Sequence, residues 1–211
     1  MMLDKEIIME SRDISKAALG RVPAYLKFLL ELPPETKNVS ATIISKGLGL
    51  GDVQVRKDLQ MISGSGRPRT GYDREELTAC LKEVLSSKSG NAVIVGAGKL
   101  GTALLDYLGF EEYGVNILAA FDKRVNKAEE HQGKMIYPVE ELGGFIKSND
   151  VKIGIIAVPA ESAQNALDLL TENGIKLICS FAPRRLEAPD DVIVQYENLA
   201  LSLAHLKYQT I

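Results

Sequence analysis

The sequence after residue 90 alternates short apolar runs with stretches of helical periodicity. The apolar runs occupy residues 91–95, 116–121, 152–158 and 176–181. Helical patterns occupy residues 98–108, 139–147 and 161–172. Near-continuous apolar strands separated by helices are typical of a parallel sheet that helices bury on both faces. We therefore predict an α/β fold for this half of the chain.

A glycine-rich turn joins the first of these strands to its helix. Gly96, Gly98 and Gly101 fit the pattern G-x-G-x-x-G in the strand-to-helix context that dinucleotide binding requires. The glycines allow a tight turn and the close approach of a pyrophosphate, which the helix N terminus can hold. Asp122 ends the next strand about 26 residues after Gly96, where Rossmann folds place the acid that binds the ribose hydroxyls. We expect a Rossmann-type domain that binds NADH and NAD.

Two basic residues, Lys123 and Arg124, follow that acid. A carboxylate at Asp122 favours the free ribose hydroxyls of NAD, whereas cations favour the 2′-phosphate of NADP. We therefore prefer NAD as the ligand, and NADP, with its ribose phosphate, stays open as the alternative.

The N-terminal part of the chain predicts a small helical unit. Val22, Leu26, Leu29 and Leu30 suggest one helical face, which ends before the prolines at 33–34. Two short helices joined by a glycine-containing turn, residues 40–46 and 53–62, are typical of a helix-turn-helix. We expect Ser40 to cap the first of them, Asp52 the second, and Asp73 a fourth helix over residues 74–85.

Basic residues gather in this unit. The chain carries 14 Lys and Arg against 12 Asp and Glu up to Lys88, and 11 against 16 after it. The helix after the turn and the glycine-rich segment 63–72, a candidate hairpin tip, both present groups that can reach base edges or phosphates. We predict a winged-helix domain bound to double-stranded operator DNA through Ser40, Gln54, Arg56, Lys57, Arg67 and Arg69.

Several classes of protein are disfavoured by the sequence. No apolar run is long enough for a membrane span, and the N terminus is too polar for a signal peptide, so we expect a cytoplasmic protein. Cys80 and Cys179 lie far apart without metal-ligand spacing, and we expect buried free thiols and no metal. His131, expected in a loop, and His205 have no sequence neighbour that suggests a catalytic base, which favours a protein that is not an enzyme.

The polar segment 86–90 marks a domain boundary. We predict a DNA-binding domain over 1–88, a dinucleotide-binding domain over 89–197, and a C-terminal helix over 198–211. That helix is apolar on more than one side, with Leu199, Leu203 and Leu206 on one stripe and Leu201 and Tyr208 off it. We expect it to be buried in a homodimer; a helix packed on its own domain is the alternative.

The chain resembles the Rex family of redox-sensing repressors from about Ile14 to the C terminus. The resemblance rests on ISKAALGRVPAYLKFL, QVRKDL, GAGKLGTALLDYLGF, AAFD, IIAVPAESAQ and SFAP, and on the closing helix. It implies a homodimer whose C-terminal helix swaps into the partner, and operator binding that NADH weakens by closing the dimer. With the glycine motif, it implies a dinucleotide site formed by Gly96, Gly98, Lys99, Leu100, Gly101, Asp122, Lys123, Val158, Pro159, Ala160, Phe181, Ala182 and Pro183, with Tyr107 at the sensing interface or in the core.

The sequence departs from the family pattern at several positions. These are Lys99 in the glycine loop, Ser180 before the FAP segment, Pro68 and Arg69 in the wing, and the aligned pair Lys27 and Asn198. A Lys–Asn contact cannot form the bidentate ion pair that Arg and Asp form across the family's dimer. These departures favour, as the alternative, the same architecture with another nucleotide or a CoA-like effector. A Rossmann oxidoreductase is the less favoured alternative.

Overall fold

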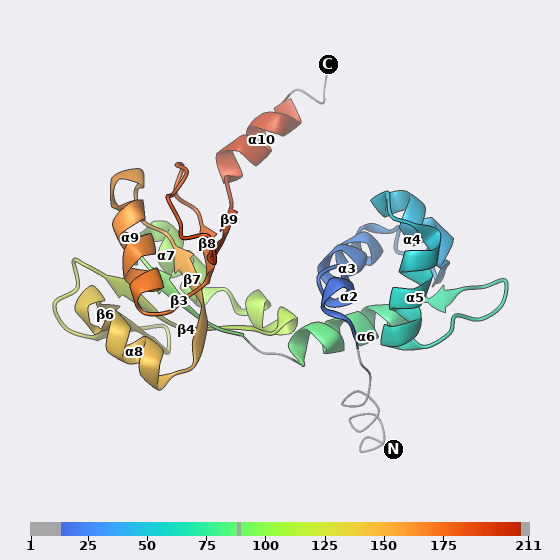
Figure 1. Cartoon of the computed structure of the whole chain (residues 1–211), viewed down its shortest axis with the longest axis horizontal. Helices are drawn as coiled ribbons and strands as arrows, with labels where there is room; N and C mark the ends of the chain where they lie inside the picture. The colour runs from blue at the N-terminus through green and yellow to red at the C-terminus, as the bar shows by residue number, and fades with distance from the viewer. Residues whose placement is uncertain (1–13, 88–89, 208–211) are drawn as a thin grey trace. The chain divides into compact units, whose positions relative to one another are not determined.

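The computed structural model describes residues 14–87 and 90–207. The chain falls into two compact units, the first ending at Lys88 and the second beginning at Ser89 (Figure 1). We call them the head and the Rossmann unit.

The head is a small helical unit with a short two-stranded sheet. Its helices are α2 (Lys16–Leu19), α3 (Val22–Glu31), α4 (Ala41–Leu48), α5 (Asp52–Ser63) and α6 (Arg74–Ser86). The strands β1 (Asn38–Val39) and β2 (Tyr72–Asp73) pair antiparallel. Apolar side chains from α3 to α6, such as Leu26, Ile44 and Leu59, pack into one core. α4 and α5 form the predicted helix-turn-helix, with Gly49 at the turn in the left-handed region (φ 65°).

The segment between α5 and β2 folds into a hairpin tip. Arg67 and Gly71 form a bridge across it, and the Arg67 N–H donates to the Gly71 carbonyl at 2.7 Å. Gly71 has a φ of +83°, and a Cβ there would lie 2.4 Å from the Val39 carbonyl oxygen. Arg69 at the tip has a φ of +66°. This segment is the wing expected from the sequence.

Helix ends in the head follow the predicted capping with one exception. The Ser40 hydroxyl accepts from the Ile43 N–H, and the Asp73 carboxylate accepts from two N–H groups of α6, as expected. Asp52 is not an N-cap: Gly51 holds that position and Asp52 is the first residue of α5. The Asp52 carboxylate instead accepts hydrogen bonds from Thr42 and Arg56, both at 2.7 Å.

Leu30 does not lie on the buried face of α3. Its side chain is 49% exposed, whereas Leu26 and Leu29 are buried. One residue advances a helix by about 100°, so the position after Leu29 turns away from the core.

The Rossmann unit contains a seven-stranded sheet in the order β5-β6-β4-β3-β7-β8-β9. The strands are β3 (Gly90–Val95), β4 (Val115–Asp122), β5 (Glu129–His131), β6 (Lys134–Pro138), β7 (Val151–Ile156), β8 (Leu177–Ser180) and β9 (Ile193–Tyr196). All neighbouring strands are parallel except β5, which pairs antiparallel with β6 at one edge. The sequence therefore predicted the sheet type and its four apolar strands.

Helices cover both faces of this sheet. They are α7 (Lys99–Asp106), η1 (Leu108–Tyr113), η2 (Val139–Glu141), α8 (Leu142–Ser148) and α9 (Ala160–Glu172). Val93 and Val95 of β3 pack with α8 and α9, while Ala92 and Ile94 pack with Leu105 of α7. Successive residues of a strand point to opposite faces, so the continuous apolar run of β3 fits a sheet with two buried faces.

In the Rossmann unit, the strands β5, β6 and β9 and the short helix η1 were not predicted. β5 and β6 lie within residues 129–138, which mix charged and apolar side chains, and β9 is an edge strand. His131 therefore lies in β5 and not in a loop as expected. Its Nε2 atom is 3.1 Å from the Asp106 carboxylate, a partner remote in sequence.

The described residues end with α10 (Leu199–Lys207), and Tyr208 lies outside them. The Asn198 side chain accepts a hydrogen bond from the Leu201 N–H at 3.0 Å and so caps the helix. Leu199, Leu201 and Leu203 are 60–69% exposed. None of the helices that the structure describes is long and apolar enough to cross a membrane.

The two cysteines are free, as expected, but only partly buried, so the expectation of full burial was wrong. Burial raises the pKa of Cys179 to about 11, and this thiol therefore stays protonated at neutral pH.

Candidate functional site

In the turn after β3, each of the three glycines has different surroundings. Gly96 has a φ of +104°, and a Cβ there would lie 2.6 Å from the Ala157 carbonyl oxygen. A Cβ on Gly101 would lie 1.8 Å from the Gly96 carbonyl oxygen, so this glycine allows α7 to pack on the turn. Gly98 is the N-cap of α7, and a Cβ there would meet nothing closer than the Arg124 Nη2 atom at 3.9 Å. The turn therefore has no room for a side chain at Gly96 or Gly101, but it is open at Gly98.

A cavity of about 620 Å³ lies at this edge of the sheet. Its walls come from the carboxyl ends of β3, β4 and β7, from the start of α7, and from one side of α9. The lining residues are Val95, Gly96, Gly98, Lys99, Leu100, Phe121, Asp122, Lys123, Arg124, Val139, Ala157, Val158, Pro159, Glu161, Ser162, Asn165, Ala166 and Leu169. The cavity thus combines a helix N terminus and cations with an apolar wall, which suits a nucleotide.

Asp122 is the buried acid of this cavity, with 7% of its surface exposed. Its Oδ1 atom accepts from the Arg124 N–H at 2.9 Å and from Arg124 Nε at 3.0 Å. Its Oδ2 atom accepts from the Ala97 N–H at 2.8 Å and from Arg124 Nη2 at 2.9 Å. The hydrogen bonds from the Arg124 side chain outweigh burial and lower the pKa of Asp122 to about 2. Asp122 is therefore ionised at neutral pH and ties the glycine turn to the end of β4.

Lys99 and Lys123 add positive charge at the cavity. Lys123 extends from the end of β4 towards α9, and its Nζ atom lies 3.4 Å from the Ser162 hydroxyl. Lys99 is exposed at the first position of α7. Glu161 is the other acid among the lining residues.

The structure brings together only part of the predicted dinucleotide site. Eight predicted residues line the cavity: Gly96, Gly98, Lys99, Leu100, Asp122, Lys123, Val158 and Pro159. Gly101 lies buried beneath the turn, and Tyr107 is 58% exposed at the end of α7. Ala160 and the segment 181–183 are not among the lining residues.

The segment 181–183 nevertheless follows a strand of the same sheet. The Phe181 N–H donates to the Ile156 carbonyl at 2.9 Å, just as the Ala157 N–H donates to the Val95 carbonyl at 2.8 Å. The loops after β3, β7 and β8 therefore follow one another along the carboxyl edge, with Asp122 on the other side of β3.

Much of the cavity wall could not be predicted from the sequence. Val139 precedes α8, and Asn165, Ala166 and Leu169 lie on α9. Their helical spacing resembles that of any core-facing helix, so no motif identified them as binding residues.

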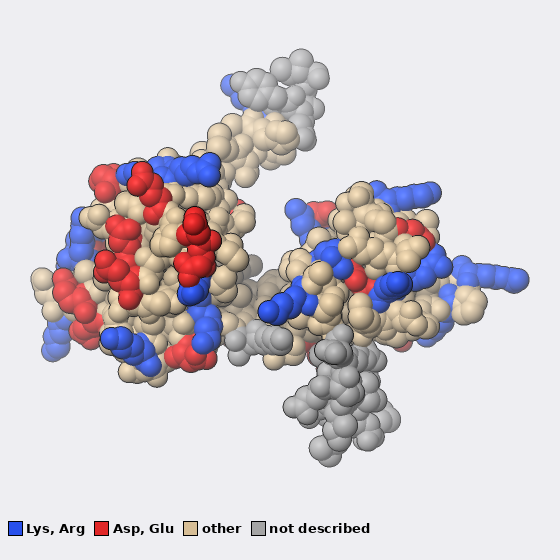
Figure 2. Space-filling view, viewed as in Figure 1, with Lys and Arg blue, Asp and Glu red and all other residues tan. Residues whose placement is uncertain are grey.

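The head presents its predicted DNA-contacting residues on one helix and on the wing. Gln54, Arg56 and Lys57 are exposed on α5. Arg67 and Arg69 are exposed on the wing, and an Arg67 Nη2 atom lies 3.9 Å from Glu76. On the face shown in Figure 2, basic side chains predominate over acidic ones on the head, whereas the Rossmann unit shows both, with several acidic groups.

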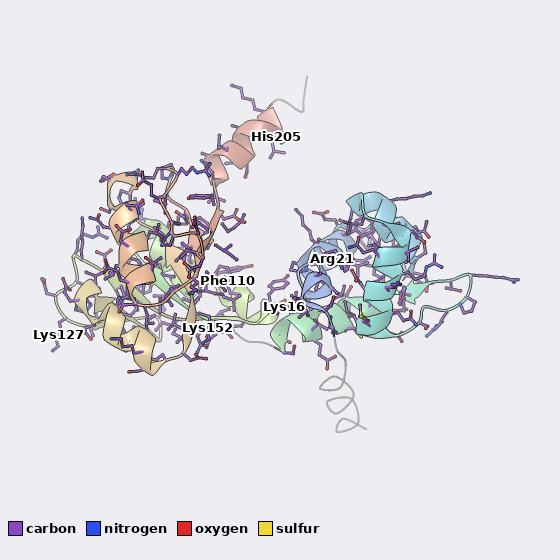
Figure 3. All side chains as sticks on the ribbon, viewed as in Figure 1. Lys16, Arg21, Phe110, Lys127, Lys152 and His205 are labelled. Carbon is purple, nitrogen blue, oxygen red and sulfur yellow. The ribbon has the colours of Figure 1, made fainter. Side chains whose placement is uncertain are left out.

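An ion pair between the buried Asp58 and the partly exposed Arg21, which the sequence did not reveal, holds α5 in the head. The Asp58 carboxylate accepts from Arg21 Nε at 2.7 Å, from Arg21 Nη2 at 3.0 Å and from the Tyr25 hydroxyl at 2.6 Å. Burial alone would raise the pKa of Asp58, but these hydrogen bonds outweigh it and lower that pKa. Arg21, labelled in Figure 3, is the residue before α3. Its ion pair with Asp58 therefore links the start of α3 to the buried side of α5.

Two family descriptions match the chain. Residues 13–60 match the family described as putative DNA-binding protein N-terminus, and residues 87–184 match the family described as CoA binding domain.

Among curated proteins, the chain is 36% identical over 203 residues to the redox-sensing transcriptional repressor Rex of Desulforamulus reducens, covering 95% of this chain and 97% of that protein. It is also 36% identical to the redox-sensing transcriptional repressor Rex of Syntrophomonas wolfei, covering 92% and 94%.

Among solved structures, the chain is similar to RSP, described as a Rex-family repressor. The complex of RSP with beta-NAD+ and operator DNA matches with 35% identity and a TM-score of 0.71, covering 93% of this chain and 92% of that one. The complex of RSP with beta-NADH matches with 35% identity and a TM-score of 0.72, covering 94% of each chain.

Proposed function

The chain belongs to the Rex family of redox-sensing transcriptional repressors, and from that premise we propose that it binds NADH and NAD at the glycine turn and that NADH lowers its affinity for operator DNA. It is a regulator and not an enzyme. The observation that carries the proposal is the cavity of about 620 Å³ where the N terminus of α7 meets the buried acid Asp122. A repressor acts on DNA, so we place it in the cytoplasm.

The order of the strands supports a direction for the dinucleotide along the carboxyl edge. The pyrophosphate is expected at Gly98, where the turn is open and the N–H groups of Lys99 and Leu100 begin α7. The adenosine half then lies towards Asp122 and the apolar wall of α9. The nicotinamide half lies on the other side of β3, towards the loops after β7 and β8.

The remaining predicted residues are part of this proposal. Gly96 and Gly101 shape the turn, Lys123 lies near the ribose, and Val158, Pro159 and Ala160 follow β7. Phe181, Ala182 and Pro183 are proposed for the nicotinamide end, with Tyr107 at the sensing interface. Bound NADH or NAD supplies the redox signal; the protein contributes binding and orientation.

We further propose that α5 lies in the major groove, with Gln54, Arg56 and Lys57 on base edges and phosphates. Among the described residues, Arg56 donates to Asp52 through Nη2 only, and the other N–H groups of its exposed side chain remain to contact DNA. Arg67 and Arg69 on the wing suit the minor groove or the backbone, and Ser40 lies at the N terminus of α4.

The exposed leucines of α10 support a homodimer in which this helix packs on the partner subunit. A stripe of exposed leucines on one helix favours burial by another protein surface. Two heads related by a two-fold axis imply an operator with two symmetric half-sites.

A mobility-shift assay with NADH and NAD added separately tests the proposal. We expect NADH to release the protein from operator DNA at concentrations where NAD does not. Equal release by both dinucleotides, or by neither, would contradict a redox sensor.

A matched pair of variants ties the response to the glycine turn. Gly98→Leu projects a side chain from the open side of the turn, and Gly144→Leu places the same side chain in α8 where no atom lies within 4 Å of its Cβ. The Gly98→Leu protein is expected to bind operator DNA and to ignore NADH, while the Gly144→Leu protein responds as wild type does.

A further inference from the structure

The carboxylate that should bind the adenosine ribose has no free acceptor position in this chain. A carboxylate offers about four lone-pair positions. All of these are taken in Asp122, by the N–H groups of Ala97 and Arg124 and by Nε and Nη2 of Arg124, at 2.8–3.0 Å. Ribose hydroxyls can donate to Asp122 only by displacing Arg124. This chain therefore lacks the preformed acceptor that distinguishes NAD from NADP.

Arg124 occupies the position where the ribose is expected, and it is held there. Its bidentate pair with Asp122 uses Nε and Nη2, and no hydrogen bond from its Nη1 atom is found among the described residues. Its side chain is 69% exposed although its partner is buried. The guanidinium also lies beside the glycine turn, since Nη2 is 3.9 Å from a Cβ built on Gly98. A guanidinium fixed in this way presents N–H donors to an incoming phosphate at little further cost in side-chain entropy.

The charges of the cavity favour a phosphate as well. Lys99 and Lys123 line it together with Arg124, against Asp122 and Glu161. Because Arg124 already neutralises Asp122, both lysines remain to attract an anion, with Glu161 on α9 opposing them.

We propose that Arg124, held by Asp122, makes this end of the cavity a seat for a phosphate on the ribose of an adenine nucleotide, which among the dinucleotides favours NADPH over NADH. The inference rests on the proposed dinucleotide site and names the ligand class within it. The same chemistry is offered by the 2′-phosphate of NADPH and by the 3′-phosphate of coenzyme A.

Calorimetric titration of the full chain with two ligand pairs tests this seat. The pairs are NADPH with NADH and coenzyme A with dephospho-coenzyme A, so each differs by one ribose phosphate. We expect NADPH to bind at least about tenfold more tightly than NADH, as one added charge-assisted contact implies. If instead only the coenzyme A pair shows a gain from its phosphate, the seat is supported and coenzyme A is its source.

Two alanine variants distinguish a specific contact of Arg124 with the phosphate from a general effect of positive charge near the cavity. Arg124→Ala is expected to abolish the gain from the ribose phosphate while NADH binds as well as before or better, because Asp122 is then free to accept from the ribose. Lys127, labelled in Figure 3, is a cation of the same loop as Arg124. Lys127 does not line the cavity, so Lys127→Ala should keep the gain.

The outcomes distinguish this inference from the proposed function. If NADH binds and the ribose phosphate strengthens binding in neither pair, the seat is overturned and the NADH sensor stands. If Arg124→Ala weakens both members of a pair equally, Arg124 only supports the fold of the site and the seat is again overturned. If neither dinucleotide binds, the proposed function fails, and the coenzyme A pair alone decides the seat.

Discussion

Two buried carboxylates, Asp58 in the head and Asp122 in the Rossmann unit, are each paired with an arginine. Each accepts hydrogen bonds from the guanidinium and from a second group, the Tyr25 hydroxyl or the Ala97 N–H. The pKa of both carboxyl groups is lowered although burial opposes it. Removing either carboxylate leaves its guanidinium and its second donor without their acceptor, so Asp58 and Asp122 are sensitive to substitution.

Substitution Asp58→Ala is expected to destabilise the head by about 2 to 4 kcal/mol, because Arg21 and the Tyr25 hydroxyl lose their acceptor. Hydrogen exchange of the α3 and α5 amides measures this loss locally. Asp150→Ala removes an exposed carboxylate and should leave the protection unchanged. Equal protection in the two variants would contradict a role for Asp58 in holding α5.

The stability of the Rossmann unit is expected to depend on acid through Asp122. Folding lowers the pKa of this carboxyl group from 3.8 to about 2, so its contribution is fully present above about pH 4 and is lost as the pH falls towards 2. Melting temperatures of the wild type and of Asp122→Asn, followed from pH 7 to pH 2.5, should converge below pH 4. A constant difference over that range would refute the assignment.

At the scale of elements, local sequence determined the features that depend on near neighbours. Ser40 and Asp73 were predicted as caps and are caps, because a cap bonds N–H groups two or three residues away. Asp52 was predicted as a cap and is not, because Thr42 and Arg56 engage its carboxylate. The four apolar strands were predicted, whereas the mixed segment β6 acquires strand structure from pairing with β4, and β5 from pairing with β6.

The candidate site also has a part that local sequence predicted and a part that it did not. The glycine turn and Asp122 follow from a motif, and both lie at the cavity. The wall formed by Val139, Asn165 and Leu169 depends on how η2 and α9 pack on the sheet, which no short motif encodes. The pairing of Arg124 with Asp122 was likewise invisible in the sequence, since Arg124 was seen there only as a nearby cation.

The glycine turn gives a prediction at this scale. Gly101→Ala would bring a Cβ to 1.8 Å from the Gly96 carbonyl oxygen, so we expect a loss of about 1 to 3 kcal/mol in stability and loss of the melting-temperature increase caused by NADH. Gly144→Ala, in α8 with no atom within 4 Å, should instead raise stability slightly. Thermal unfolding with and without NADH measures both effects. Similar behaviour of the two variants would contradict this account of the turn.

At the scale of the whole molecule, the exposed leucines of α10 predict self-association. Leu203→Glu should shift the protein from dimer to monomer, because it places a carboxylate within the proposed subunit contact. Sedimentation at several protein concentrations measures the change. Leu177→Glu alters an exposed leucine of β8 and should leave the dimer intact. An unchanged dimer in Leu203→Glu would show that α10 is not the contact.

The pairing of β8 with β9 joins the nicotinamide end of the proposed site to that contact. The Glu197 N–H donates to the Ser180 carbonyl at 2.9 Å, so α10 begins close to the residue before Phe181. Coupling between two binding events is reciprocal, and the factor by which NADH weakens operator binding is also the factor by which the operator weakens NADH binding. If NADH weakens operator binding as proposed, copies bound to a promoter bind NADH more weakly than copies in solution, and their release needs a higher NADH level than occupancy of the free protein does.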